Sequence, residues 1–103
     1  MTKAIRLAVT MGDPAGIGPE IIVKAIQQMQ GEVEAGRIEF LVLGSSAALT
    51  RACDLFGTKQ ADLPLTMIDV GPVDGEIVTG TISAVGGEWA YRAVKRAAEL
   101  VQA

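Results

Sequence analysis

The sequence predicts an α/β layer fold with a mainly parallel sheet and flanking helices. Strand-like apolar runs and amphipathic helix-like runs follow one another in the order β-α-β-α-β-loop-α, which is typical of parallel strands joined by helical crossovers. Half of the residues (50%) are hydrophobic but only 4% are aromatic, so aliphatic side chains must fill the core. The 103 residues suffice for one small domain.

The first strand and helix follow from residue spacing. Residues 4–10 predict a short buried strand, because Ile5, Leu7 and Val9 alternate with other residues. Residues 19–29 predict a helix that begins at Pro19, where the missing N–H would have no intrahelical partner. The apolar stripe of this helix is expected to contain five residues, Ile21, Ile22, Ala25, Ile26 and Met29. Residues 31–36 are expected to form a polar connection.

The middle of the chain predicts a second strand and helix. Residues 38–43 are nearly all apolar, as in a parallel strand that is covered on both faces. Ser45 or Ser46 is expected to cap the helix that follows, and Gly57 is expected to end it. The buried stripe of this helix is expected to contain Leu49, Ala52, Cys53 and Phe56. Residues 65–70 predict a third strand.

A long helix is expected near the end of the chain, after a structured loop at residues 71–81. Ser83 is suited to cap this helix, which is expected to reach about Gln102. Two pairs, Glu88–Arg92 and Lys95–Glu99, have the i,i+4 spacing of helical ion pairs. The buried stripe is expected to contain Ala90, Ala93, Val94, Ala97, Leu100 and Val101.

Two glycines stand in the first turn of this expected helix. Gly86 and Gly87 each weaken a helix by roughly 1 kcal/mol relative to alanine, so we expect a close neighbour to require them. Trp89 and Tyr91 are on the same helix and face different directions. One of the two is therefore expected to pack and the other to be half exposed.

Charge and composition exclude several classes of function. The formal net charge is −3 without a basic block, so neither nucleic acid nor an anionic membrane is expected as a partner. No apolar run approaches the ~20 residues that span a bilayer, and no signal peptide is evident, so a cytoplasmic location is expected. The chain has no histidine, the commonest general base and metal ligand. Cys53, the single cysteine, is interpreted as a buried small hydrophobe.

A glycine-rich loop, MGDPAGIGPE at residues 11–20, joins the first strand to the first helix. It resembles a nucleotide-binding turn, but the dinucleotide pattern G-x-G-x-x-G fails because Ile21 stands at the third glycine position. Asp13 and Glu20 would oppose a phosphate at this helix N-terminus. Two interpretations stay open: a tight structural turn, or a ligand-binding loop at the carboxyl end of a strand.

The stretch VTMGDPAGIGPEI at residues 9–21 resembles the N-terminal signature of the 4-hydroxythreonine-4-phosphate dehydrogenase family of pyridoxal phosphate biosynthesis. The later stretch FLVLGSSAAL and the spacing of Gly80, Ser83 and Gly87 also resemble this family, so the likeness covers the whole chain. Isocitrate and isopropylmalate dehydrogenases are a more distant likeness. Their corresponding loop is G-D-G-I-G-P-E, without the Pro14-Ala15 insertion, and the resemblance implies the N-terminal portion of that fold.

The resemblance implies an oxidoreductase that uses NAD or NADP and a divalent metal (Zn, Mg or Co). Its expected substrate is a small phosphorylated hydroxy acid, 4-(phosphooxy)-L-threonine, which is oxidised and then decarboxylated. Members of the family are homodimers and much longer than this chain, and their histidine metal ligands have no counterpart here. Residues 1–103 are therefore expected to be a single α/β segment, an incomplete domain of a longer enzyme. Alone it is expected to be inactive and to bind no cofactor tightly, and no catalytic or metal-binding residue is assigned.

The site residues that the resemblance implies are confined to the glycine-rich loop. Gly12, Asp13, Pro14, Gly16 and Gly18 are expected to line the cofactor side of a cleft. Asp13 is the foremost candidate for a polar contact, although it is also suited to bracing the turn through its own backbone. Two alternatives stay open: a related dehydrogenase of erythronate or threonate 4-phosphate, and a non-catalytic α/β module that associates through an open sheet edge.

Overall fold

The computed structural model describes residues 4–102 and confirms the predicted α/β class with a parallel sheet. The sheet has three strands in the order β1 (Ile5–Thr10), β2 (Ile38–Gly44) and β3 (Leu65–Asp69). Both strand pairs are parallel, with Ile5 opposite Ile38 and Phe40 opposite Leu65. All three carboxyl ends therefore lie at one edge of the sheet.

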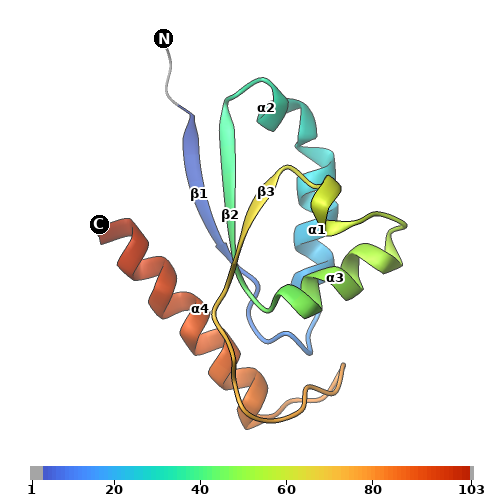
Figure 1. Ribbon diagram of the computed structural model, residues 1–103, viewed down its shortest axis with the longest axis vertical. Helices are drawn as coiled ribbons and strands as arrows, with labels where there is room; N and C mark the ends of the chain where they lie inside the picture. Colours follow the sequence, from blue (N-terminus) through green and yellow to red (C-terminus); the bar gives the residue numbers. More distant parts are fainter. Residues whose placement is uncertain (1–3, 103) are drawn as a thin grey trace.

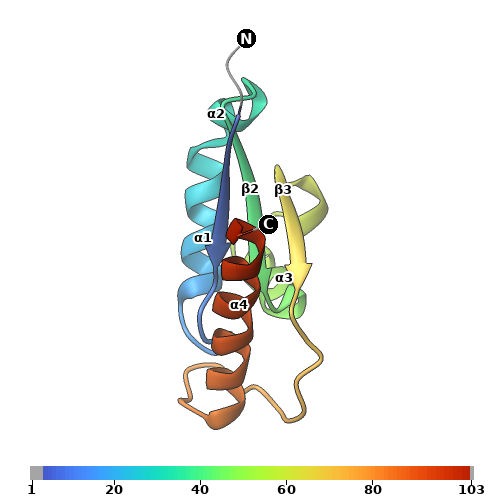
Figure 2. The same ribbon diagram turned by 90° about the vertical axis from the view of Figure 1, so that its left-hand side faces the viewer.

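Helices cover both faces of the sheet, which gives three layers (Figures 1 and 2). The helices α1 (Gly18–Gln28) and α3 (Ser46–Leu55) pack together on one face, and α4 (Ala84–Gln102) crosses β1 and β2 on the other. Two short elements, α2 (Gln30–Glu34) and the 3-10 helix η1 (Gln60–Asp62), complete the described chain. No helix within residues 4–102 is long and apolar enough to cross a membrane.

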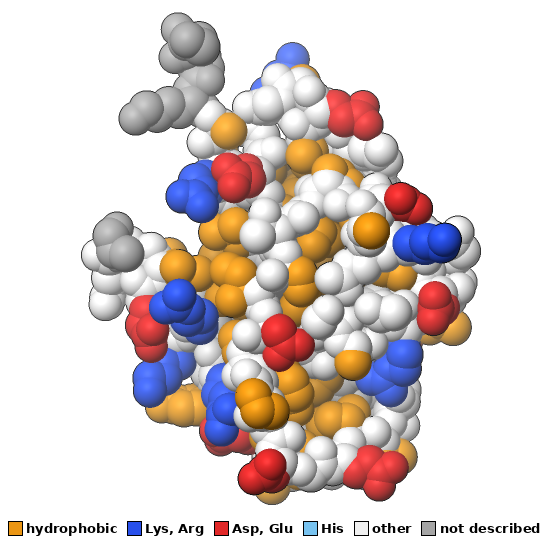
Figure 3. Space-filling model, viewed as in Figure 1, with side chains coloured by type: hydrophobic (Ala, Val, Ile, Leu, Met, Phe, Trp, Pro, Cys, Tyr) orange, Lys and Arg blue, Asp and Glu red, His pale blue; other side chains and the backbone are white. Residues whose placement is uncertain are grey.

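The main core lies between the sheet and the pair α1 and α3. Its completely buried members, with no exposed surface, are Val23, Val42, Leu49 and Cys53. The opposite face of the sheet is contacted by α4, whose buried residues are Gly86 and Ala93. On the face seen in Figure 3, acidic and basic side chains are interspersed rather than gathered into one patch.

The predicted caps are confirmed. The Ser45 hydroxyl accepts the Ala48 N–H at 3.2 Å and caps α3, and the Ser83 hydroxyl accepts the Gly86 N–H at 3.1 Å at the start of α4. Each serine thus satisfies one of the N–H groups that lack an intrahelical partner in the first turn.

The predicted burial of β1 is wrong. Ile5 is 61% exposed and Leu7 is 39% exposed, because β1 is an edge strand that pairs only with β2. The predicted stripe of α1 is wrong in part, since Ile21 and Ala25 are exposed and Val23 is buried instead. The helix α1 packs against α3, and its buried residues are Pro19, Ile22, Val23 and Ile26.

The remaining differences are local. The polar connection expected at residues 31–36 is largely helical, since α2 spans most of it, and the Glu32–Arg37 ion pair at 3.1 Å closes this segment. The predicted pair Glu88–Arg92 is confirmed at 2.9 Å. Glu99, however, pairs with Arg96 at 3.2 Å rather than with Lys95.

The stripe predicted for α4 is also only partly buried. Ala93 is buried, whereas Val94 is 57% exposed and Val101 is 78% exposed. Trp89 is partly buried and Tyr91 is 62% exposed, which confirms that one of the two packs.

Candidate functional site at the carboxyl edge of the sheet

The residues that follow β1 and β3 are hydrogen-bonded to the last residues of β2. The Met11 N–H donates to the Leu43 carbonyl at 3.1 Å, and the Val70 N–H donates to the Gly44 carbonyl at 3.0 Å. The Gly80 N–H donates to the Ala15 carbonyl at 2.7 Å, which ties the loop before α4 to the glycine-rich loop. The carboxyl edge of a parallel sheet is where α/β proteins place ligands, so this edge is the candidate site.

The glycine-rich loop is a tight turn that Asp13 braces. Oδ1 of Asp13 accepts the Ala15 N–H at 2.8 Å, and its backbone carbonyl accepts the Gly16 N–H at 2.9 Å. Gly12 has a φ of 72°, in the left-handed region that favours glycine. The bracing role considered for Asp13 is therefore confirmed, while its contact with a cofactor stays a prediction.

Two close approaches explain glycines at this edge. A side chain at Gly18 would collide with the backbone carbonyl of Met11, and one at Gly86 would collide with the carboxylate of Asp13. Nothing lies within 4 Å of the corresponding position at Gly87. The expectation that a close neighbour requires the glycine pair is right for Gly86 and wrong for Gly87.

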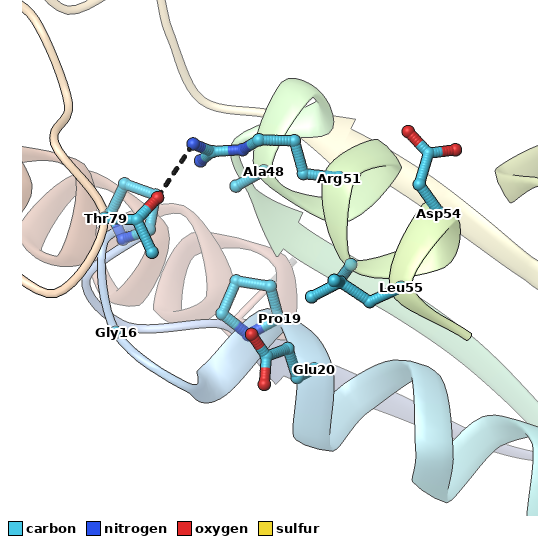
Figure 4. A pocket seen from close by; sticks show the side chains of 10 residues that line it. Gly16, Pro19, Glu20, Ala48, Arg51, Asp54, Leu55 and Thr79 are labelled. Carbon is cyan, nitrogen blue, oxygen red and sulfur yellow. Dashed lines mark hydrogen bonds between the residues drawn. The ribbon is translucent and has the colours of Figure 1, made fainter. Parts of the chain in front are cut away.

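A cavity of about 250 Å³ opens between the glycine-rich loop, α3 and Thr79. Figure 4 shows the Arg51 side chain reaching from α3 to Thr79, whose hydroxyl it meets at 3.0 Å. Of the five predicted site residues, Pro14 and Gly16 line this cavity. The other three, Gly12, Asp13 and Gly18, are not part of its lining and instead shape the turn behind it.

The lining of the cavity is partly apolar and contains charged side chains of both signs. Prolines, Ala48, Ala52 and Leu55 form its apolar part, and the carboxylates of Glu20 and Asp54 and the guanidinium of Arg51 are its charged members. Glu20 also lies in the first turn of α1, which has no side-chain cap in the described structure. The Glu20 carboxylate at this helix start supports the expectation that the loop itself is no phosphate cradle.

A metal site is not formed by this part of the chain. Within residues 4–102, no group of three or more histidine, cysteine, aspartate or glutamate residues is placed to hold a metal ion. Cys53 is buried in the core, and burial first, then the neighbouring Asp54 carboxylate, raises the pKa of its thiol. A thiol in this state is a poor nucleophile, and the interpretation of Cys53 as a buried small hydrophobe is confirmed.

Asp69 was not among the residues predicted from the sequence. This residue ends β3, and its carboxylate accepts the Ser46 N–H at 2.9 Å and the Gly71 N–H at 2.8 Å. It therefore fixes the N-terminus of α3 and the start of the loop before α4. The available signal was an aspartate at a strand end two residues before a glycine, a setting in which aspartate bonds nearby backbone.

A parallel sheet with a glycine-rich loop at its carboxyl edge defines an α/β protein, and in this class ligands commonly bind at that edge. No protein-family model matches the chain. It is 42% identical over 108 residues to a Bradyrhizobium diazoefficiens protein provisionally named D-threonate 4-phosphate dehydrogenase, covering 94% of this chain and 31% of that protein. It is 37% identical over 114 residues to the D-threonate 4-phosphate dehydrogenase of Salmonella typhimurium, covering 96% of this chain and 33% of that one.

Two solved structures of dehydrogenases are also similar to this chain. A 4-hydroxythreonine-4-phosphate dehydrogenase from Burkholderia phymatum matches 98% of this chain and 34% of its own, with a TM-score of 0.75 and 30% identity. A terephthalate 1,2-cis-dihydrodiol dehydrogenase from Burkholderia xenovorans matches 97% of this chain and 32% of its own, with a TM-score of 0.72 and 30% identity. The chain is a homologue of 4-hydroxythreonine-4-phosphate and D-threonate 4-phosphate dehydrogenases, and it spans about a third of their length.

Proposed function

We propose that this chain forms the glycine-rich-loop part of a dehydrogenase that oxidises a 4-phosphorylated four-carbon hydroxy acid. The observation that carries the proposal is the likeness to dehydrogenases over nearly the whole chain, in sequence and in fold together. The proposed reaction is hydride transfer to NAD or NADP followed by decarboxylation, with a divalent metal, in a cytoplasmic homodimer. The finer substrate is either 4-(phosphooxy)-L-threonine or D-threonate 4-phosphate. The higher identity to a protein named for the latter, 42% against 34%, favours D-threonate 4-phosphate.

The described residues fit a limited part of a dinucleotide. The cavity beside Pro14 and Gly16 has apolar side chains, two carboxylates and the Arg51 guanidinium in its lining, and we propose that it takes an uncharged ring or hydroxyl groups of the dinucleotide. When bound, the dinucleotide would accept the hydride. Gly12, Asp13 and Gly18 would act by holding the turn in place, because their contacts are with the chain itself.

The described residues do not fit the metal. The chain contains no histidine, and no cluster of three ligating residues forms within residues 4–102. We therefore derive no step of the reaction through a metal at this edge, and propose that its ligands belong to other parts of the active enzyme. Because the described residues form no metal site, we expect that the 103-residue chain does not turn over substrate by itself.

A chimera tests this proposal. This chain would replace the matching third of the Salmonella typhimurium D-threonate 4-phosphate dehydrogenase, to which it is 37% identical. Reduction of NAD and NADP would be followed with both candidate substrates and with Mg, Zn or Co. We expect turnover from the chimera and none from the isolated chain. A chimera that folds and dimerises like the parent enzyme but is inactive would contradict the proposal, as would turnover by the isolated chain.

A further inference from the structure

We propose that Gly86 is a positioning residue for the glycine-rich loop. Its missing side chain leaves the space in which the Asp13 carboxylate rests against the first turn of α4. We call this contact between Asp13 and Gly86 the loop latch. What the loop binds rests on the proposed function, whereas the latch itself is a property of the folded chain.

The fit at Gly86 is specific to Asp13. A Cβ atom at Gly86 would have as its three nearest neighbours the Cγ, Oδ1 and Oδ2 atoms of Asp13, all in collision. The carboxylate is not free to swing away, because Oδ1 accepts the Ala15 N–H at 2.8 Å. Making room for a side chain would therefore break the bond that braces the turn.

Electrostatics favour the same arrangement. The first turn of α4 contains no acidic residue of its own, although a helix N-terminus carries a partial positive charge that a carboxylate stabilises. Ser83 satisfies the Gly86 N–H at 3.1 Å. Asp13 brings a negative charge to this turn from a distant part of the sequence, so the latch combines steric fit with charge.

The latch acts on the wall of the cavity. Asp13 is followed by Pro14, Ala15 and Gly16. Pro14 and Gly16 line the cavity, and the Ala15 carbonyl accepts the Gly80 N–H at 2.7 Å. The loop is thus held at two points, one on α4 and one on the loop that precedes α4. Displacement of Asp13 would move the cavity wall.

The two neighbouring glycines provide a matched comparison. Gly86→Ala and Gly87→Ala add the same methyl group to the same helical turn, but only the first meets Asp13. In the ¹⁵N-labelled chain, we expect Gly86→Ala to shift the amide signals of Ala15 and Gly16. The Ala15 amide should exchange with solvent about tenfold faster, as expected for the loss of one hydrogen bond. Gly87→Ala should leave these signals and rates unchanged and should unfold at the same or a higher urea concentration.

A double variant separates the latch from a general loss of stability. Removing the carboxylate removes the collision, so Asp13→Ala/Gly86→Ala should unfold at the urea midpoint of Asp13→Ala alone or above it, since alanine is the better helix former. Additive losses in the double variant, or equal effects of the alanines at positions 86 and 87, would overturn the proposal. If Gly86→Ala does not fold, the double variant decides: a folded double variant supports the latch, and an unfolded one beside a folded Gly87→Ala refutes it.

The KM values of the chimera test whether the loop latch affects the proposed function. In the chimera with the Salmonella typhimurium enzyme, Gly86→Ala should raise the KM for the dinucleotide severalfold more than the KM for the hydroxy acid, while Gly87→Ala changes neither. An unchanged KM in a chimera whose Ala15 and Gly16 amides do shift would remove the cofactor role of the loop and leave the latch intact.

Discussion

Asp69 joins two backbone segments at the carboxyl end of β3, and replacing it should destabilise the chain measurably. Its two carboxylate oxygens accept the Ser46 N–H at 2.9 Å and the Gly71 N–H at 2.8 Å. Asp69→Ala removes both acceptors and the negative charge beside the first turn of α3. Asp69→Asn keeps one oxygen acceptor and removes only the charge and the second bond.

The expected magnitude follows from these contacts. A hydrogen bond contributes about 0.5–1.5 kcal/mol net, and loss of a helix-capping acceptor costs about 0.5–2 kcal/mol. Asp69 is exposed, so water replaces part of each bond, and we expect about 1–2 kcal/mol for Asp69→Ala. The asparagine variant should lose about half of that, because one of its two acceptors remains.

Urea unfolding followed by circular dichroism measures this difference. With a slope of about 1–3 kcal/mol per molar urea for a small protein, the alanine variant should unfold at a midpoint roughly 0.3–2 M lower. Asp74→Ala is the matched control, since it removes an exposed carboxylate from the next loop. Equal midpoints for the alanine variants at 69 and 74 would refute the reasoning, and so would an asparagine variant no better than alanine.

Two further predictions concern the core. Leu49 has no exposed surface, so Leu49→Ala should lower the free energy of unfolding by about 2–5 kcal/mol; a loss below 1 kcal/mol in urea unfolding would contradict the packing of α3 on the sheet. Cys53 is equally buried, and burial raises the pKa of its thiol, so it should resist Ellman's reagent in the folded chain and react stoichiometrically in urea. Because the pKa of the thiol is higher in the folded chain, its contribution to stability is complete below the unfolded pKa of about 8.5 and is lost at more alkaline pH. Rapid reaction of the folded chain with Ellman's reagent near neutral pH would contradict the burial of Cys53.

Local features of the fold were predictable from sequence because local chemistry determines them. Ser45 and Ser83 precede amphipathic runs, and both act as caps in the structure. Burial was less predictable because it depends on neighbours that the sequence does not name. Ile21 and Val23 are both apolar and two residues apart, and only the position of α3 decides that Val23 is buried and Ile21 exposed.

In the candidate site, too, a local contact was predictable from the sequence and a contact between distant segments was not. The bond from the Ala15 N–H to Asp13 spans two residues, and the sequence indicated it through an aspartate that precedes a proline. The contact between Asp13 and Gly86 joins distant parts of the chain. The sequence indicated only that a glycine pair in a helix needs a reason, and did not show which glycine had one.

The structure also bears on how a phosphorylated substrate would be held. Three helices of the described chain begin at the carboxyl edge of the sheet, and each has a carboxylate in or against its first turn. Glu20 lies within α1, Asp69 accepts an N–H of α3, and Asp13 rests against α4. A helix N-terminus binds an anion through free N–H groups and its partial positive charge, and here carboxylates of the chain already occupy or oppose that position. The phosphate of the proposed substrate therefore needs cationic side chains rather than these helix ends, and Arg51 is a cationic side chain in the lining of the cavity at this edge.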